Sequence, residues 1–147
     1  MTIIEPATRA LLVEDAVRAF PDECCGFMFG VEDEEENRLI KEILVVNNAK
    51  EGDKTRRFEI SPLDYLKAEQ YAIDNNLLLL GIYHSHPKHP AIPSETDRQA
   101  AQPFFSYVII SVLENNIITL RSWRLNEEEK FEEEKITDYQ FTLNEKE

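Results

Sequence analysis

The strongest structural signal in the chain is LLLLGIYHSHP, which occupies residues 77–87. Its apolar part, from Leu77 to His84, is continuous and of strand length, which is typical of a central strand buried on both faces. Two histidines, His84 and His86, stand at the end of this run. Since alternate residues of a strand point to the same face, both imidazoles can be aimed at one point.

On either side of this strand, helical and extended patterns alternate. Ser61 and Pro62 are typical of a helix start, and Ser94 is placed to cap a short helix after a proline-rich loop. The expected helices cover residues 6–20, 61–74 and 94–102, and the expected strands cover 25–31, 39–46, 77–84, 107–113, 117–125 and 130–136. This order predicts an α+β (mixed α/β) fold, with one mixed β-sheet and helices packed beside it. The 147 residues show no internal repeat and no linker, which predicts a single domain over 1–147.

The amino-acid composition limits the kinds of partner and the location that are expected. The net charge of −13 argues against nucleic acid and against anionic membrane surfaces. No apolar run approaches the roughly 18 residues of a membrane-spanning helix, and no basic-then-apolar segment opens the chain, so a cytoplasmic protein is expected. Cys24 and Cys25 are adjacent, which disfavours a disulfide between them and fits a reducing compartment. The apolar residues that follow predict buried, unreactive thiols.

Much of the negative charge lies in two segments, 32–36 with five acids and 127–135 with six acids and two lysines. Such runs are usually solvated, so a turn and a sheet edge exposed to water are expected. A docking surface for a basic partner is the second interpretation.

His84 and His86 form a candidate metal site together with Asp97, which follows in the first turn of the expected short helix. Two imidazoles and a carboxylate suit zinc, and three protein ligands with an open fourth position are the pattern of a catalytic site. A fourth protein ligand would close the site, so His89 is expected to be a surface loop residue. A single histidine at a strand end is usually structural, and two histidines at this spacing are a weak signal alone, because they also occur in cupin-like and amidohydrolase sites. Ser94, three residues before Asp97, makes the pattern more specific.

Glu23 is the candidate general base. It stands where a helix is expected to give way to a strand, beside apolar residues rather than within a charge run. Taken alone, it would be interpreted as a surface acid. Next to a zinc ion, which brings the pKa of water to near 7, a carboxylate can accept a proton and later deliver it to a leaving amine.

Three segments together resemble the JAMM (JAB/MPN-domain) zinc metallopeptidase family, in particular its short stand-alone bacterial and archaeal members. They are PDECCG at 21–26, GIYHSHP at 81–87 and PSETD at 93–97, and the similarity covers about residues 5–125. The resemblance implies an MPN-type, cytidine-deaminase-like fold with a curved sheet. It also implies that His84, His86 and Asp97 bind one Zn²⁺, that Glu23 is the general acid/base, and that Ser94 helps to stabilise the oxyanion. Ser85 is expected to face the opposite side of its strand.

The resemblance further implies hydrolysis of an amide bond after the C-terminal Gly-Gly of a ubiquitin-like or sulfur-carrier protein, whose tail a strand edge could bind. A non-catalytic MPN-type binding or scaffold domain is the alternative, although such domains typically lack some of the ligands. A zinc deaminase is disfavoured because the His-x-Glu and Pro-Cys-x-x-Cys patterns are missing. The acidic C-terminal extension, 126–147, lies outside the resemblance and has no assigned role.

Overall fold

The computed structural model describes residues 1–115 and 117–138. Three helices are present: α1 (Pro6–Ala19), α2 (Pro62–Asp74) and α3 (Glu95–Ala100). The strands are β1 (Thr2–Ile4), β2 (Cys25–Glu32), β3 (Arg38–Val46), β4 (Leu78–Pro87), β5 (Ser106–Val112), β6 (Ile118–Leu125), β7 (Phe131–Glu134) and β8 (Ile136–Asp138). All three expected helices form, and their ends lie within two residues of the predicted ones.

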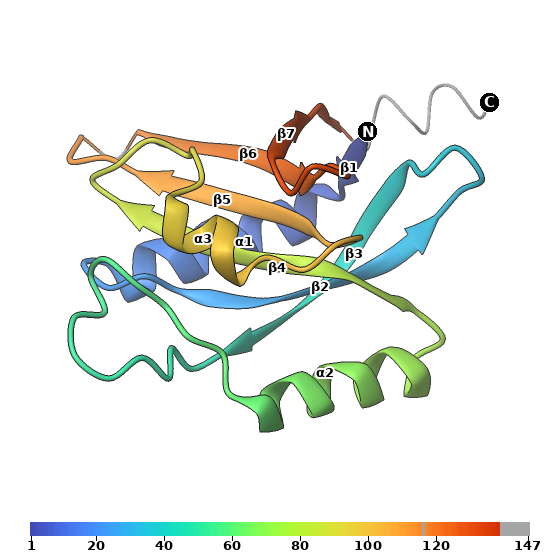
Figure 1. Ribbon diagram of the computed structural model, residues 1–147, viewed down its shortest axis with the longest axis horizontal. Coiled ribbons are helices and arrows are strands. Elements are labelled where there is room, and N and C mark those ends of the chain that lie inside the picture. The colour runs from blue at the N-terminus through green and yellow to red at the C-terminus, as the bar shows by residue number, and fades with distance from the viewer. Residues whose placement is uncertain (116, 139–147) are drawn as a thin grey trace.

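The eight strands form one mixed sheet in the order β7-β6-β5-β4-β2-β3-β1-β8 (Figure 1). Strand β4, the apolar run that the sequence marks as central, lies inside it, antiparallel to β2 and parallel to β5. The register pairs Cys25 with His84 on one side and Ile109 with His84 on the other. The histidines therefore lie on a strand whose backbone is held from both sides.

Helices α1 and α2 cover opposite faces of this sheet. On one face, Leu12 and Ala16 of α1 pack with Met28 and Tyr83. On the other face, Ala68 and Ala72 of α2 pack with Phe27, Phe29 and Ile82. Alternate residues of β2 and β4 thus enter different clusters, as the period of a strand requires. The short helix α3 lies in front of β4 and β5 in Figure 1, on the side away from α1.

The C-terminal segment differs from the prediction. One strand was expected over residues 130–136, but β7 pairs with β6 and β8 pairs with β1, with Lys135 between them. The two strands at opposite ends of the sheet order are thus neighbours in sequence, and the curved sheet comes close to closing on itself. Strand β1, three residues at the start of the chain, was not predicted; it lies between β3 and β8.

The two acidic segments have different surroundings. Residues 32–36 are exposed at the turn between β2 and β3, as expected. In the second segment Glu134 departs from the expected solvated edge, because its side chain is mostly buried and pairs with Arg124 at 2.5 Å. Of the predicted extension 126–147, residues 139–147 lie outside the described residues. None of the described helices combines the length and the apolar content needed to cross a membrane.

Candidate metal centre and active site

Three side chains converge at the end of β4. His84 Nε2 lies 3.2 Å from His86 Nε2, and Asp97 Oδ2 lies 3.2 Å and 3.1 Å from these two nitrogens. A tetrahedral ion bound at 2.0–2.1 Å needs ligand atoms about 3.3 Å apart. The two nitrogens and the oxygen therefore form a triangle of the same size as one face of the tetrahedron around a metal ion. We call it the histidine–aspartate triangle, and its donor atoms fit such an ion.

Both imidazoles are held in a form that can bind a metal. His86 Nδ1 lies 2.9 Å from the carbonyl oxygen of Pro90, which can only accept, so Nδ1 carries a proton and, in the neutral ring, Nε2 is the nitrogen with the lone pair. His84 is 1% exposed and stacks on Phe58, with ring centroids 4.5 Å apart. Burial lowers the pKa of His84 and favours the neutral ring, which is the form that ligates metals.

Asp97 is fixed by the start of α3. The Ser94 N–H donates to Asp97 Oδ2 at 2.9 Å, and the Asp97 N–H donates to Ser94 Oγ at 3.0 Å, which makes a capping box. Burial raises the pKa of Asp97, but the interaction with His84 and the hydrogen bonds with His86 and the Ser94 N–H outweigh it and lower the pKa below its ordinary value. Asp97 is therefore an anion, as a ligand must be. The Ser94 hydroxyl accepts from Asp97, so its own hydrogen is free to donate elsewhere.

Glu23 lies in the connection between α1 and β2, as expected. The antiparallel register that pairs Cys25 with His84 places Glu23 across from His86, on the same face. Its side chain is 6% exposed, and Oε1 is buried without a hydrogen-bond partner among the described residues. Burial raises the pKa of Glu23 to about 8. A buried carboxylate with a free oxygen beside the histidine–aspartate triangle has the position and the pKa of a proton carrier.

The other residues singled out in the sequence lie outside the group of proposed ligands. Ser85 points to the α1 face, as expected, where its Oγ accepts from the backbone N–H of Cys24 at 2.8 Å. Both cysteines are free and buried, and burial raises the pKa of Cys25 to about 12 and that of Cys24 still further. Such thiols are not ionised at neutral pH. His89 is exposed and lies outside the triangle, as expected.

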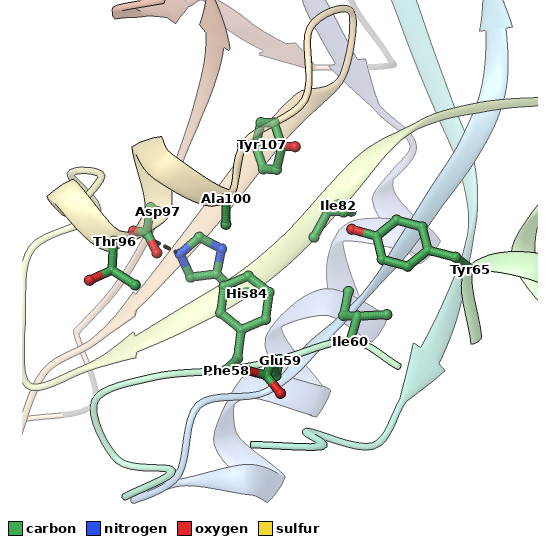
Figure 2. Close-up of a pocket in the computed structure, with 10 residues that line it drawn as sticks. All are labelled: Phe58, Glu59, Ile60, Tyr65, Ile82, His84, Thr96, Asp97, Ala100 and Tyr107. Carbon is green, nitrogen blue, oxygen red and sulfur yellow. Dashed lines mark hydrogen bonds and ion pairs between the residues drawn. The ribbon is translucent and has the colours of Figure 1, made fainter. Parts of the chain in front are cut away.

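Two cavities flank the triangle. The first, of about 170 Å³, contains His84 and Asp97 and is otherwise mostly apolar (Figure 2), with walls from Phe58, Ile60, Tyr65, Ile82, Ala100 and Tyr107. The second, of about 270 Å³, is polar and is lined by Glu23, Arg56, Arg57, His86, His89, Pro90, Ile92 and Ser94. The triangle thus stands between an apolar and a polar chamber.

The loop between β3 and α2 is also part of the site and was not predicted from the sequence. Phe58 covers His84. Asn48 uses its whole side-chain amide: Nδ2 donates to the carbonyl oxygens of Glu23 and Arg57, and Oδ1 accepts from the N–H groups of Lys50 and Glu59. The only signal was Asn47-Asn48 after a strand, which indicates a strand end and says nothing about a distant glutamate.

Comparison with known proteins identifies the family of this chain. The family described as prokaryotic homologs of the JAB domain matches residues 5–126. A desampylase of Pyrococcus furiosus is 32% identical over 135 residues, which are 92% of this chain and 89% of the relative. A CysO-cysteine peptidase of Mycobacterium bovis is 32% identical over 117 residues, 78% of this chain and 75% of the relative.

A solved structure shows the same fold. The solution structure of a protein from Desulfitobacterium hafniense matches with a TM-score of 0.84 and 29% identity, over 94% of this chain and 92% of that one. The family match spans Glu23, His84, His86 and Asp97, and the similar chains are matched over most of their length. The chain therefore belongs to the prokaryotic homologs of the JAB domain.

Proposed function

We propose that this chain is a zinc-dependent peptidase that hydrolyses the amide bond after the C-terminal Gly-Gly of a ubiquitin-like or sulfur-carrier protein. The observation that carries the proposal is the triangle of His84, His86 and Asp97 facing the unpartnered carboxylate of Glu23. The relatives named desampylase and CysO-cysteine peptidase support it.

The proposed ion is Zn²⁺, with His84, His86 and Asp97 as its ligands. Two neutral imidazole nitrogens and one carboxylate oxygen, spaced for a tetrahedron, suit zinc better than the larger and oxygen-rich shells of calcium or magnesium. Three protein ligands leave one position open, as in other catalytic sites. When bound, zinc supplies the Lewis acidity that activates a water molecule and polarises a carbonyl group.

Glu23 and Ser94 carry out the remaining steps. The Glu23 carboxylate accepts the proton of the attacking water and delivers it to the leaving nitrogen, so that the C–N bond breaks and a free amine departs. Its buried position raises its proton affinity toward the range useful near neutral pH. The free hydrogen of the Ser94 hydroxyl points to a role as donor to the developing oxyanion.

The apolar cavity supports a slender acyl group. It lies between α3 and the extended residues 58–60, and a Gly-Gly tail has no side chains to hinder its entry. The Glu59 backbone is occupied, since its N–H donates to Asn48 Oδ1 and its carbonyl accepts from the Ala49 N–H at 2.8 Å. In an extended segment the backbone groups of Phe58 and Ile60 point to the other side, where a tail could add as a strand.

The test combines metal analysis with cleavage. Purified protein is expected to bind about one zinc per chain and to cleave a ubiquitin-like protein fused through its Gly-Gly to a reporter. Glu23→Gln should keep the metal and lose about 10²–10⁴-fold in kcat, because the proton carrier is removed while the ligands stay. Asp97→Ala should lose metal and activity together. A Glu23→Gln variant with normal turnover would refute the role of Glu23, and a metal-free wild type would favour a scaffold domain.

The proposal includes a cytoplasmic location. It is supported by the two reduced, buried cysteines, which need no oxidising compartment to fold.

A further inference from the structure

The polar cavity is lined by positively charged side chains, although the chain as a whole is strongly negative. The chain has a net charge of −13, yet one wall of this cavity consists of Arg56 and Arg57, both exposed, from the loop between β3 and α2. Glu23 and Ser94 line the same cavity. Two adjacent arginines therefore share a chamber of about 270 Å³ with Glu23, His86 and Ser94 of the proposed reaction centre.

These two arginines are not used by the fold. Five other arginines (Arg18, Arg38, Arg98, Arg121 and Arg124) form ion pairs with carboxylates. Within residues 1–115 and 117–138, no ion pair includes Arg56 or Arg57. Arg57 Nη1 donates only to the neighbouring Arg56 carbonyl, at 2.8 Å. Most of their N–H donors remain available, in a chain with 29 acidic residues that could have paired with them.

The wall that carries them is fixed relative to Glu23. Asn48 Nδ2 donates to the carbonyl oxygens of both Glu23, at 3.1 Å, and Arg57, at 3.0 Å. The Glu23 N–H donates to the Lys54 carbonyl at 2.7 Å. The side-chain amide of Asn48 thus links Glu23 to the loop that carries the two arginines. The charge of Arg57 is also felt by Glu23, since it opposes the rise in the pKa of that carboxyl.

The path of the proton indicates which part of the substrate each cavity receives. This step rests on the proposed function: Glu23 gives its proton to the leaving nitrogen, so the leaving group must lie on the side of Glu23. The polar cavity then receives the leaving group, and the apolar cavity receives the acyl tail.

We propose that Arg56 and Arg57 bind the free α-carboxylate of a leaving amino acid, so that the preferred substrate is a carrier protein whose C-terminal glycine bears one single amino acid. Guanidinium groups match carboxylates in charge and shape. Water adds to the glycine carbonyl, the C–N bond breaks, and the products are a carrier ending in a carboxylate and a free amino acid. An isopeptide-linked lysine would bring methylene groups to this wall, and a longer fusion would bring a neutral amide.

The experiment compares two substrates that differ only in this charge. Ubiquitin is extended after its Gly-Gly by one alanine, with either a free carboxylate or a carboxamide at its end. We expect kcat/KM for the acid to exceed that for the amide by about tenfold or more, mainly through KM. The double change Arg56→Gln with Arg57→Gln should reduce cleavage of the acid to the level of the amide. Lys50→Gln, in the same loop but outside this cavity, removes one positive charge and should keep the preference.

Equal cleavage of acid and amide would overturn the inference and leave the proposed function intact. A preference that survives in the double variant would also overturn it, because the carboxylate would then be read elsewhere, for example by the metal.

If neither substrate is cleaved, the result counts against the proposed function, and binding decides the inference. A peptide ending in Gly-Gly-Ala is titrated into zinc-loaded Glu23→Gln protein by calorimetry. The acid should bind about tenfold more tightly than the amide, and only while both arginines are present. Equal affinities would overturn the inference.

Discussion

At the scale of single residues, Ser94 caps α3 and has the proposed role of donor to the oxyanion, and the two can be tested apart. Its Oγ accepts from the Asp97 N–H and caps α3, while its hydroxyl hydrogen stays free for an oxyanion. Its backbone N–H, which any residue provides, donates to Asp97 Oδ2. Loss of the side chain should therefore spare the position of the proposed metal ligand.

We expect Ser94→Ala to retain its zinc and to lose about 10²-fold in kcat, because one donor to the oxyanion is removed. The lost cap should cost up to about 1 kcal/mol. Zinc analysis, steady-state kinetics and urea unfolding measure the three quantities.

Ser61 offers the matched control, because it caps α2 in the same way, with its Oγ accepting from the Asp64 N–H at 3.2 Å. Ser61→Ala should lose about 1 kcal/mol of stability and keep its kcat. If both variants lose activity equally, the effect of Ser94 comes from helix capping, and its role as a donor is wrong.

At the scale of elements, the loop between β3 and α2 is held by one side chain. Asn48 makes four hydrogen bonds of 3.0–3.1 Å, which include the Glu23 carbonyl and the Arg57 carbonyl. All donors and acceptors of its amide are in use. Asn48 is therefore a positioning residue: it touches no proposed ligand, but it sets the distance between the base and the loop.

Asn48→Ala should lower the free energy of unfolding by about 1–3 kcal/mol, because several backbone groups lose their partner. It should also lower kcat while zinc content stays unchanged, since the proposed ligands lie on β4 and α3. Asn47→Ala is the control: Asn47 is exposed and makes no side-chain hydrogen bond among the described residues, so stability and kcat should stay near the wild-type values. Unchanged kcat in Asn48→Ala would show that the loop does not position Glu23.

The elements also show what the sequence can predict. Strand β4 and the caps of α2 and α3 follow from local patterns, and so does the placement of His84 and His86 on one face. Asn48, Phe58 and the arginine wall act through contacts with segments distant in sequence, which no local period records. Strand β1 has three residues, too few for a period, and the division of 131–138 into two strands depends on which edges they meet.

At the scale of the whole molecule, the C-terminal segment adds one strand at each end of the sheet, β7 beside β6 and β8 beside β1. Glu134 lies where the sheet comes close to closing on itself, and its Oε2 accepts from Thr2 Oγ1 at 3.1 Å and from Ser122 Oγ at 2.7 Å. Its other oxygen pairs with Arg124. Burial raises the pKa of Glu134, but the hydrogen bonds from Ser122 and Thr2 and the charge of Arg124 outweigh it and lower the pKa below its ordinary value. The prediction of a single domain over 1–147 stays a prediction, because 139–147 lie outside the described residues.

Glu134→Ala should destabilise the fold by about 3 kcal/mol, since it leaves a partly buried arginine and two hydroxyl groups without their acceptor. The adjacent Glu133 pairs with Arg121 at the surface, where both side chains are at least one-third exposed. Glu133→Ala should cost less than about 1 kcal/mol. Urea unfolding of the two variants measures the difference, and equal losses would mean that the closure does not depend on Glu134.

No residue of helix α3 is fully buried, and its main contact with the sheet is the one that Asp97 makes with the two histidines. A ligand that binds only the closed arrangement stabilises it. Removal of the metal should therefore release this helix while the sheet stays folded. Trypsin would then report the state of the enzyme: cleavage after Arg98 should become faster with a chelator and slow again with zinc, whereas cleavage after the exposed Arg56 should proceed at the same rate in both. Because both cleavage sites lie in the same chain, cleavage after Arg56 serves as the internal reference for cleavage after Arg98.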